Sequence, residues 1–249
     1  MKRIYIFLAL TGFALMSCDS DVEWFGVVES GDQNTNSIHQ IEHKDEKVSV
    51  NKNDSINDSI SSVKNTPKLL LESSVTIIAK NNRNKPISQG SGAFIAQNKI
   101  VTNFHVIEEG QMFEITLNSN NEIKYEAQLL NIDRVHDIAI LEMNTFFPSK
   151  VLKINKNYPD IGDDIIVAGT PLGLEGTISK GNISAIRKFP PDDYDLFQIS
   201  APISPGSSGG PVVNLNGELI GISVAGVKAD GAQNLNFAVP AKYIYFLMQ

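Results

Sequence analysis

Pro205-Gly206-Ser207-Ser208-Gly209-Gly210-Pro211 is a turn sequence that holds two serines between two runs of strand-forming residues. Glycine adopts backbone conformations closed to other residues and lets another segment come close. A loop of this kind can direct its amides at a substrate carbonyl, as acyl transfer requires. Taken alone, the same residue types are more typical of an ordinary surface turn. The interpretation therefore depends on whether the chain also supplies a base.

Length and charge narrow the class of protein. The 249 residues allow one large domain or two small ones, and a hydrophobic content of 42% is ordinary for a packed globular protein. The net charge is −7, and no cluster of Lys and Arg forms a basic face. Because phosphate neutralisation needs such a face, we expect no nucleic-acid partner.

The first residues, 1–17, have the layout of a secretory signal peptide, with a basic start and then an apolar run from Ile4 to Met16. That run is too short for a transmembrane anchor, which is the alternative interpretation. Leu15-Met16-Ser17-Cys18 resembles the bacterial lipobox, and the resemblance implies an exported protein of the cell envelope, lipid-anchored to a membrane at Cys18. Cys18 is the only cysteine, which excludes an intramolecular disulfide and leaves a lone core or reactive thiol as the alternative.

Residues 18–67 are rich in Asn, Asp, Ser, Lys and Glu and predict a disordered polar tether. Trp24-Phe25-Gly26-Val27-Val28 is an apolar exception, either a docking patch or a stray cluster in a linker. His39-Gln40-Ile41-Glu42-His43 matches the H-x-x-E-H pattern of some zinc proteases. No amphipathic helix surrounds that pattern, so we interpret it as a chance match and predict no metal site.

Residues 68–249 predict an all-β domain, because short strand-like runs recur about every ten residues between Gly, Asn and Pro. The first half, about 69–152, could form a barrel or a sandwich from the runs Val75–Lys80, Gly92–Ala96, Met112–Leu117, Ile123–Leu130 and Ile138–Met143. The second half, about 160–240, contains Ile165–Gly169, Gly176–Arg187, Leu196–Ser200, Val212–Val213, Glu218–Val224 and Leu235–Val239. Only Ala241–Met248 is predicted to be helical.

A base and a carboxylate are both available in the first half. His105 follows a strand-like run and could project from its end, and Asp137 immediately precedes the apolar run Ile138–Met143. A serine hydroxyl becomes a good nucleophile when a histidine takes its proton and a carboxylate orients that histidine. Each of these residues taken singly has a plain structural interpretation, but the three together favour catalysis.

Six segments around these residues resemble trypsin-like serine peptidases of the HtrA (Deg) type, in the same order and spacing. They are Gln89-Gly90-Ser91-Gly92-Ala93-Phe94-Ile95, Thr102-Asn103-Phe104-His105-Val106, His136-Asp137-Ile138-Ala139-Ile140-Leu141, the stretch from Ile161-Gly162-Asp163 to Leu174, Thr177-Ile178-Ser179-Lys180-Gly181-Asn182-Ile183-Ser184, and Gly206-Ser207-Ser208-Gly209-Gly210-Pro211. The resemblance covers about residues 70–243 and implies two antiparallel six-stranded β-barrels with a short C-terminal helix. The catalytic groups are then expected in the cleft between the barrels.

The resemblance also implies the roles of individual residues. Ser208 rather than Ser207 is the expected nucleophile, His105 the base, and Asp137 rather than Asp133 its orienting carboxylate. The amides of Gly206 and Ser208 are the expected oxyanion hole. The expected substrate-binding residues are Ile203, Ser223, Val224 and Ala225, and no cofactor is expected.

The expected activity is that of a serine endopeptidase of unfolded or extended polypeptides. The resemblance further implies a homo-oligomer, a trimer, and the family's PDZ domains are expected to be absent. A catalytically inactive binding or holdase protein with the same cleft is the main alternative. An esterase of the G-x-S-x-G kind would need a strand-to-helix elbow and the order Ser, acid, His, which the chain does not have.

Overall fold

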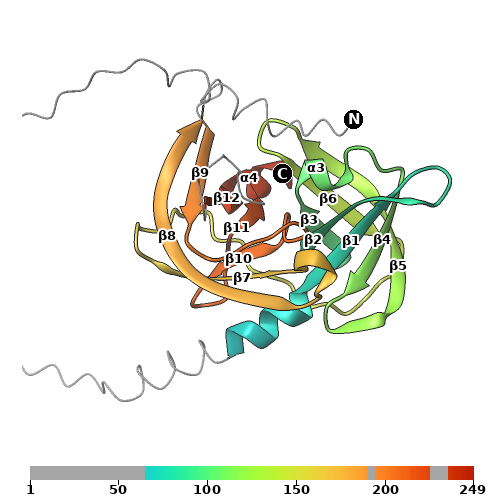
Figure 1. Cartoon of the computed structure of the whole chain (residues 1–249), viewed down its shortest axis with the longest axis horizontal. Helices are drawn as coiled ribbons and strands as arrows, with labels where there is room; N and C mark the ends of the chain where they lie inside the picture. Colours follow the sequence, from blue (N-terminus) through green and yellow to red (C-terminus); the bar gives the residue numbers. More distant parts are fainter. Residues whose placement is uncertain (1–64, 190–193, 225–234) are drawn as a thin grey trace, which may run out of the picture.

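The structure is a computed structural model that describes residues 65–189, 194–224 and 235–249 (Figure 1). Cys18, the apolar segment at residues 24–28 and the predicted substrate residue Ala225 lie outside these residues. Within them, no helix is both long enough and apolar enough to cross a membrane.

Twelve strands form two closed antiparallel barrels of six strands each. The first barrel contains β1 (Ser74–Lys80), β2 (Pro86–Ala96), β3 (Lys99–Thr102), β4 (Met112–Leu117), β5 (Asn120–Asp133) and β6 (Ile138–Met143). The second contains β7 (Asp164–Gly169), β8 (Thr177–Phe189), β9 (Tyr194–Ile199), β10 (Pro211–Asn214), β11 (Leu219–Val224) and β12 (Asn236–Pro240). The orders are β1-β2-β3-β6-β5-β4 and β10-β11-β12-β9-β8-β7, the same ring traced in opposite directions. The predicted fold is confirmed.

The strands near the junction are apolar on both faces because each face packs against a different core. In β6, Ala139 and Leu141 point into the first barrel, whereas Ile138 and Ile140 belong to a cluster shared with the second barrel. In β7, Ile165 and Val167 point into the second barrel, and the alternate residues join the shared cluster. Period-two alternation therefore gives each barrel its own interior and also joins the two barrels.

The helices differ from the sequence prediction. Ala241–Leu247 forms the expected C-terminal helix, α4, but residues 65–73 are also helical, and His105 lies on a four-residue helix, α3 (Phe104–Ile107), rather than at the end of a strand. α3 has only four residues, too few to show a helical period in the sequence, and residues 65–67 belong to the segment predicted as a polar tether. Leu70 and Val106 are 0% and 2% exposed, so packing against the barrels, and not local propensity, determines these helices.

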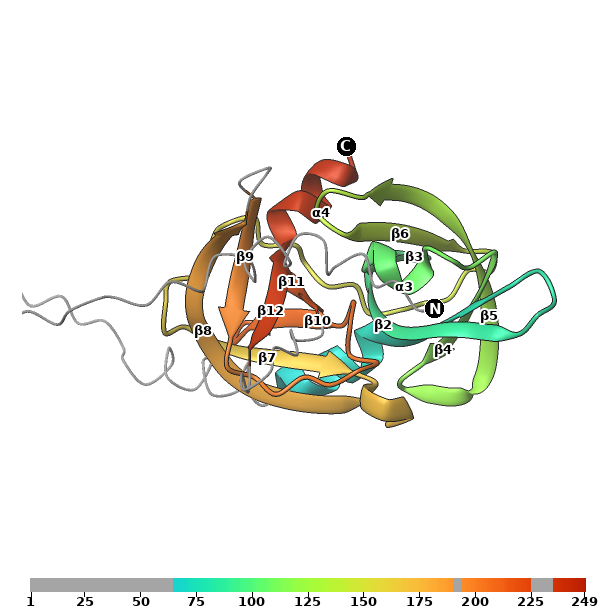
Figure 2. The same ribbon diagram turned by 45° about the horizontal axis from the view of Figure 1, so that its top comes forward.

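α4 lies across the junction of the two barrels and packs on β11, β12 and β5 (Figure 2). Its Ile244 is fully buried in the shared cluster. The carbonyl of Leu247 accepts a 3.0 Å hydrogen bond from Asn131 Nδ2 on β5. The end of the chain thus contributes to holding the first barrel against the second.

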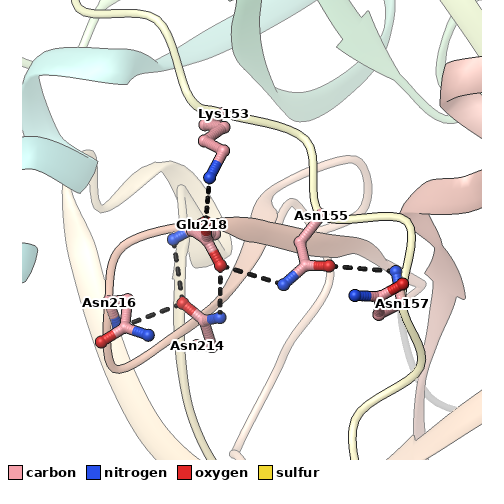
Figure 3. A network of polar contacts seen from close by, with 6 residues as sticks. All are labelled: Lys153, Asn155, Asn157, Asn214, Asn216 and Glu218. Carbon is pink, nitrogen blue, oxygen red and sulfur yellow. Dashed lines mark hydrogen bonds and ion pairs between the residues drawn. The ribbon is translucent and has the colours of Figure 1, made fainter.

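The segment between the barrels is attached to the second barrel around Glu218 (Figure 3). The Glu218 carboxylate accepts hydrogen bonds from Lys153 Nζ at 2.6 Å, Asn155 Nδ2 at 2.9 Å and Asn214 Nδ2 at 3.1 Å. Backbone bonds join Leu219 N to the Lys153 carbonyl and Asn155 N to the Leu219 carbonyl. One carboxylate therefore fixes both the connecting segment and the turn between β10 and β11.

Candidate active site

His105 and Asp137 make a two-point contact. Asp137 Oδ2 lies 2.7 Å from His105 Nδ1, and Asp137 Oδ1 accepts a 2.8 Å hydrogen bond from the His105 backbone amide. The side chains are about a quarter exposed, 25% for the histidine and 22% for the aspartate. Since the carboxylate engages Nδ1, Nε2 is the ring nitrogen that remains available for proton transfer.

Asp137 holds this position with a left-handed backbone conformation, φ 55°. A left-handed conformation costs a residue with a side chain roughly 1–2 kcal/mol. The Asp137 carbonyl accepts hydrogen bonds from Phe104 N at 3.1 Å and Asn103 Nδ2 at 3.0 Å. The strained residue is thus held by its backbone as well as by its carboxylate.

Asp133, the other candidate carboxylate, serves a different histidine. Its Oδ2 lies 2.6 Å from His136 Nδ1, and the His136 ring stacks on Tyr243 of α4 at 3.8 Å between centroids. The structure therefore brings Asp137 to His105 and directs Asp133 toward the junction with α4.

Two glycines shape the turn at residues 205–211. Gly206 and Gly209 have φ of +98° and +85°, in the region that favours glycine. A Cβ on Gly206 would lie 2.5 Å from the Thr170 carbonyl oxygen, and one on Gly209 would lie 2.2 Å from that of Ser91. Both separations are too short, so the turn needs glycine for its conformation and for its close packing.

The carbonyls of the turn are directed into the protein. The Pro205 carbonyl accepts a hydrogen bond from Leu172 N at 2.9 Å, and the Gly206 carbonyl accepts one from Ser91 Oγ at 2.8 Å. The Ser207 carbonyl accepts from Ser223 Oγ at 2.7 Å, and the Ser208 carbonyl accepts from Ser91 N at 2.8 Å. In a planar trans peptide the N–H points opposite to the C=O. The amides of Gly206 and Ser208 therefore point away from these partners. Among the described residues, no backbone carbonyl accepts a bond from the Gly206 amide.

The turn lies directly beside the segment that carries His105. A Cβ on Gly90 would lie 2.6 Å from a methyl of Val106 and 3.0 Å from the Ser208 carbonyl oxygen, so both neighbours meet at one point of β2. On the other side of the turn, a Cβ on Gly209 would lie 3.1 Å from Asn103 N. The structure thus brings together the three segments that the sequence singled out.

The two serines of the turn are equally buried, at 4% exposure each, but they differ in surroundings. The Ser207 side chain lies against Gly169, where a Cβ would be 3.2 Å from its Oγ, and 3.5 Å from the Ser204 amide. Ser207 thus faces β7 of the second barrel. Ser208 is the serine whose carbonyl is bonded to the first barrel, next to α3.

The predicted substrate residues have different environments. Ile203 is half-buried and packs on the core of the second barrel, and Val224 is 8% exposed at the end of β11. Ser223 bonds to the turn through its hydroxyl, its amide, which donates to the Gly210 carbonyl, and its carbonyl, which accepts from Gly209 N. Ser223 thus supports the turn from behind.

Sequence reasoning missed the supporting roles of Ser91 and Asn103. Both residues lie in motifs that the sequence singled out, Gly90-Ser91-Gly92 and Thr102-Asn103, but nothing in the motifs indicates which groups they bond. Ser91 bonds the turn from the other barrel, and Asn103 bonds the Asp137 carbonyl. Within the described ranges, no group of three or more His, Cys, Asp or Glu side chains could hold a metal ion.

Comparison with known proteins places this arrangement in context. A family model described as a trypsin-like peptidase domain matches residues 90–222, which include His105, Asp137 and Ser208. A probable periplasmic serine endoprotease, DegP-like, from Rhizobium meliloti is 36% identical over 166 residues, covering 64% of this chain and 32% of the relative. A serine protease HtrA-like from Staphylococcus aureus is 34% identical over 160 residues, covering 58% and 20%.

A solved structure is also similar. The crystal structure of the serine endoprotease from Yersinia pestis superposes with a TM-score of 0.64 at 27% identity, covering 75% of this chain and 65% of that one. The chain spans about a third of the length of the first curated relatives that it matches, 32% and 33%.

Proposed function

We propose that this chain, which belongs to the trypsin-like peptidase domain family, is a serine endopeptidase that acts on unfolded or extended proteins. The observation that carries the proposal is the two-point contact of Asp137 with His105, beside a glycine turn whose carbonyls at residues 205–208 are directed inward. This arrangement contains a base, its orienting carboxylate and a serine on a rigid turn, which are the parts that acyl transfer needs.

In the proposed reaction, Ser208 Oγ attacks the carbonyl carbon of the substrate while His105 Nε2 takes the hydroxyl proton. Asp137, held at Nδ1, keeps the imidazole in the required tautomer and stabilises its protonated form. The C–N bond then breaks, and the proton passes from His105 to the leaving amine. Water then attacks the resulting ester while His105 takes one of its protons. The bond between the acyl carbon and the Ser208 oxygen breaks to release the carboxylic acid, and His105 returns the proton to Ser208.

The amides of Gly206 and Ser208 would stabilise the negative oxygen that forms during each attack. Loss of one such donor typically lowers the rate by about 10²–10³-fold. The inward direction of the turn carbonyls supports this role, because it turns both amides away from the protein.

The proposed substrates are extended chains that pair, as an added strand, with the segment Ser223-Val224-Ala225. We place the P1 side chain beside Ile203 and Val224, both apolar. The segment Ala201-Pro202-Ile203-Ser204 contains no carboxylate that would attract Lys or Arg. A small or medium aliphatic P1 residue fits these surroundings, and cleavage-site profiling that returned mainly basic P1 residues would overturn this assignment.

The proposed location is the cell envelope. The curated relatives from Rhizobium meliloti and Bartonella henselae carry the word periplasmic in their names. Lipid attachment at Cys18 is the proposed anchor, and metabolic labelling with an alkyne fatty acid of wild type beside Cys18→Ser tests it. Equal labelling of the two would contradict the anchor.

The enzymatic proposal is tested by fluorophosphonate labelling and casein hydrolysis of the full chain. Wild type is expected to label and to hydrolyse, and Ser208→Ala to do neither. Ser207→Ala is the matched control, since its serine is equally buried and its hydroxyl has no part in the proposed chemistry. A wild type that binds unfolded protein but does not label would favour the inactive holdase instead.

A further inference from the structure

Ser91 is a buried serine of the first barrel whose polar groups are all engaged. It lies in the middle of β2 with no exposed surface. Its amide donates to the Ser208 carbonyl at 2.8 Å, and its own carbonyl accepts from Thr102 Oγ1 at 2.7 Å. Its hydroxyl lies between two groups of the second barrel, the Gly206 carbonyl at 2.8 Å and the Thr170 amide at 2.9 Å.

The direction of the Ser91 hydroxyl is determined by its partners. A hydroxyl has one proton to donate and lone pairs to accept. The Thr170 amide can only donate, so the hydroxyl oxygen accepts there and its proton goes to the Gly206 carbonyl. One side chain therefore connects two backbone segments, at residues 170 and 206, by accepting a hydrogen bond from the first and donating one to the second.

Gly206 needs this support because it has no side chain. Its φ of +98° is one of several conformations open to glycine, and a rotation of either adjoining peptide would redirect its amide. The peptide before Gly206 is held at the Pro205 carbonyl by Leu172 N. The peptide after it is held at the Gly206 carbonyl by Ser91 Oγ.

Ser91 acts on both of these peptides. It holds the later one directly, and it holds the earlier one through Thr170, two residues before the Leu172 amide that binds Pro205. We propose that Ser91 is a positioning residue: its hydroxyl fixes the two peptides on either side of Gly206 and so keeps the Gly206 amide directed at the substrate oxygen. This inference rests on the proposed function for its effect on the rate, but not for its effect on the turn.

The first test is Ser91→Ala, which keeps the Cβ and both backbone bonds and removes only the hydroxyl. The value of kcat is expected to fall at least about tenfold, toward the 10²-fold loss of a missing oxyanion donor, with KM within about twofold. The inhibition constant of a peptide aldehyde is expected to rise by the same factor as kcat/KM falls, because the aldehyde adduct uses the same amides.

Thr76→Val is the matched control. Thr76 is also a buried hydroxyl of the first barrel that bonds to residue 170, with Thr76 Oγ1 and Thr170 Oγ1 2.7 Å apart, but it makes no bond to the turn. We expect it to lower Tm about as much as Ser91→Ala while leaving kcat within about twofold. Equal kinetic losses in the two variants would overturn the proposal in favour of general destabilisation.

A second measurement does not depend on activity. Pro205-Gly206 is the only Pro-Gly pair in the sequence, so carbonyl-¹³C proline with ¹⁵N glycine identifies the Gly206 amide in an NMR spectrum. Ser91→Ala is expected to move that resonance, and Thr76→Val to leave it in place. An unmoved resonance in Ser91→Ala would overturn the proposal. If wild type neither labels nor hydrolyses, the enzymatic proposal fails, and this spectrum still decides the role of Ser91.

Discussion

Asp137 binds His105 at two points, with one carboxylate oxygen 2.7 Å from Nδ1 and the other 2.8 Å from the backbone amide of the same residue. The contact ties the carboxylate to the backbone of α3 as well as to the ring, so the imidazole cannot rotate without losing its contact with Asp137 Oδ2. A nearly identical contact joins Asp133 to His136, with Asp133 Oδ2 2.6 Å from His136 Nδ1. This second pair offers an internal control for the first.

Asp137→Asn is expected to lower kcat by about 10³–10⁴-fold with little change in fold, because the carboxamide favours the wrong tautomer of His105. Asp133→Asn makes the same chemical change at the His136 pair and is expected to keep kcat within a few-fold. Steady-state hydrolysis with thermal unfolding as a fold check measures both. Comparable losses in the two variants would contradict the assignment of Asp137.

Asn103→Ala removes the side-chain donor to the Asp137 carbonyl, 3.0 Å away. The expected loss is about 1–2 kcal/mol in the free energy of unfolding, as for one buried hydrogen bond whose partner stays buried. Because Asp137 sits in a strained conformation, kcat is expected to fall as well, by about tenfold or more. Urea unfolding and hydrolysis assays check the two effects, and unchanged kcat would mean that the bond from Phe104 N is enough to hold the Asp137 carbonyl.

Gly206→Ala introduces a Cβ 2.5 Å from the Thr170 carbonyl oxygen at φ +98°. The turn must shift to accommodate it, so kcat is expected to fall by about 10² or more through loss of the amide donor. Gly162→Ala is the control, since Gly162 has nearly the same φ, +99°, but no atom within 4 Å of the added carbon. Stability losses of roughly 1–2 kcal/mol in both variants, with a rate loss only at residue 206, are the expected pattern.

Glu218 gives a prediction for the pH dependence of stability. The hydrogen bond from Lys153, followed by that from Asn214, lowers the pKa of Glu218 below its ordinary value. A lowered pKa in the folded state means that the ionised form stabilises the fold above the unfolded value, about 4.3, and that this contribution disappears as the pH falls through the folded pKa. Glu218→Gln should therefore cost roughly 1 kcal/mol at pH 7 and progressively less below about pH 4.

The check on Glu218 is urea unfolding of wild type and Glu218→Gln at pH 7 and pH 3. Glu72→Gln serves as the control, because the nearest lysine nitrogen to Glu72 is 3.9 Å away, on a lysine that is 78% exposed. A difference between wild type and Glu218→Gln that stays constant across this range would show that packing, and not charge, explains the effect.

Much of the fold was predictable because strand periodicity is a local signal. Each predicted run overlaps an observed strand, and Asn214-Leu215-Asn216-Gly217 marks the turn between β10 and β11. α3 was not predictable, because a segment of four residues shows no clear helical period, and the helix at residues 65–73 includes polar residues that the sequence assigned to a tether. Burial of Phe104 and Leu70 against the barrels stabilises them instead.

The sequence by itself determined the double all-β architecture and the identity of the candidate residues His105, Asp137 and Ser208, because spacing and residue type are written along the chain. Only the tertiary structure decided which hydrogen bonds hold them. The Ser91 hydroxyl reaches Gly206 across 115 positions of sequence and between two barrels, and no local pattern encodes such a contact. It exists because closing each barrel and burying the shared apolar cluster brings β2 against the turn.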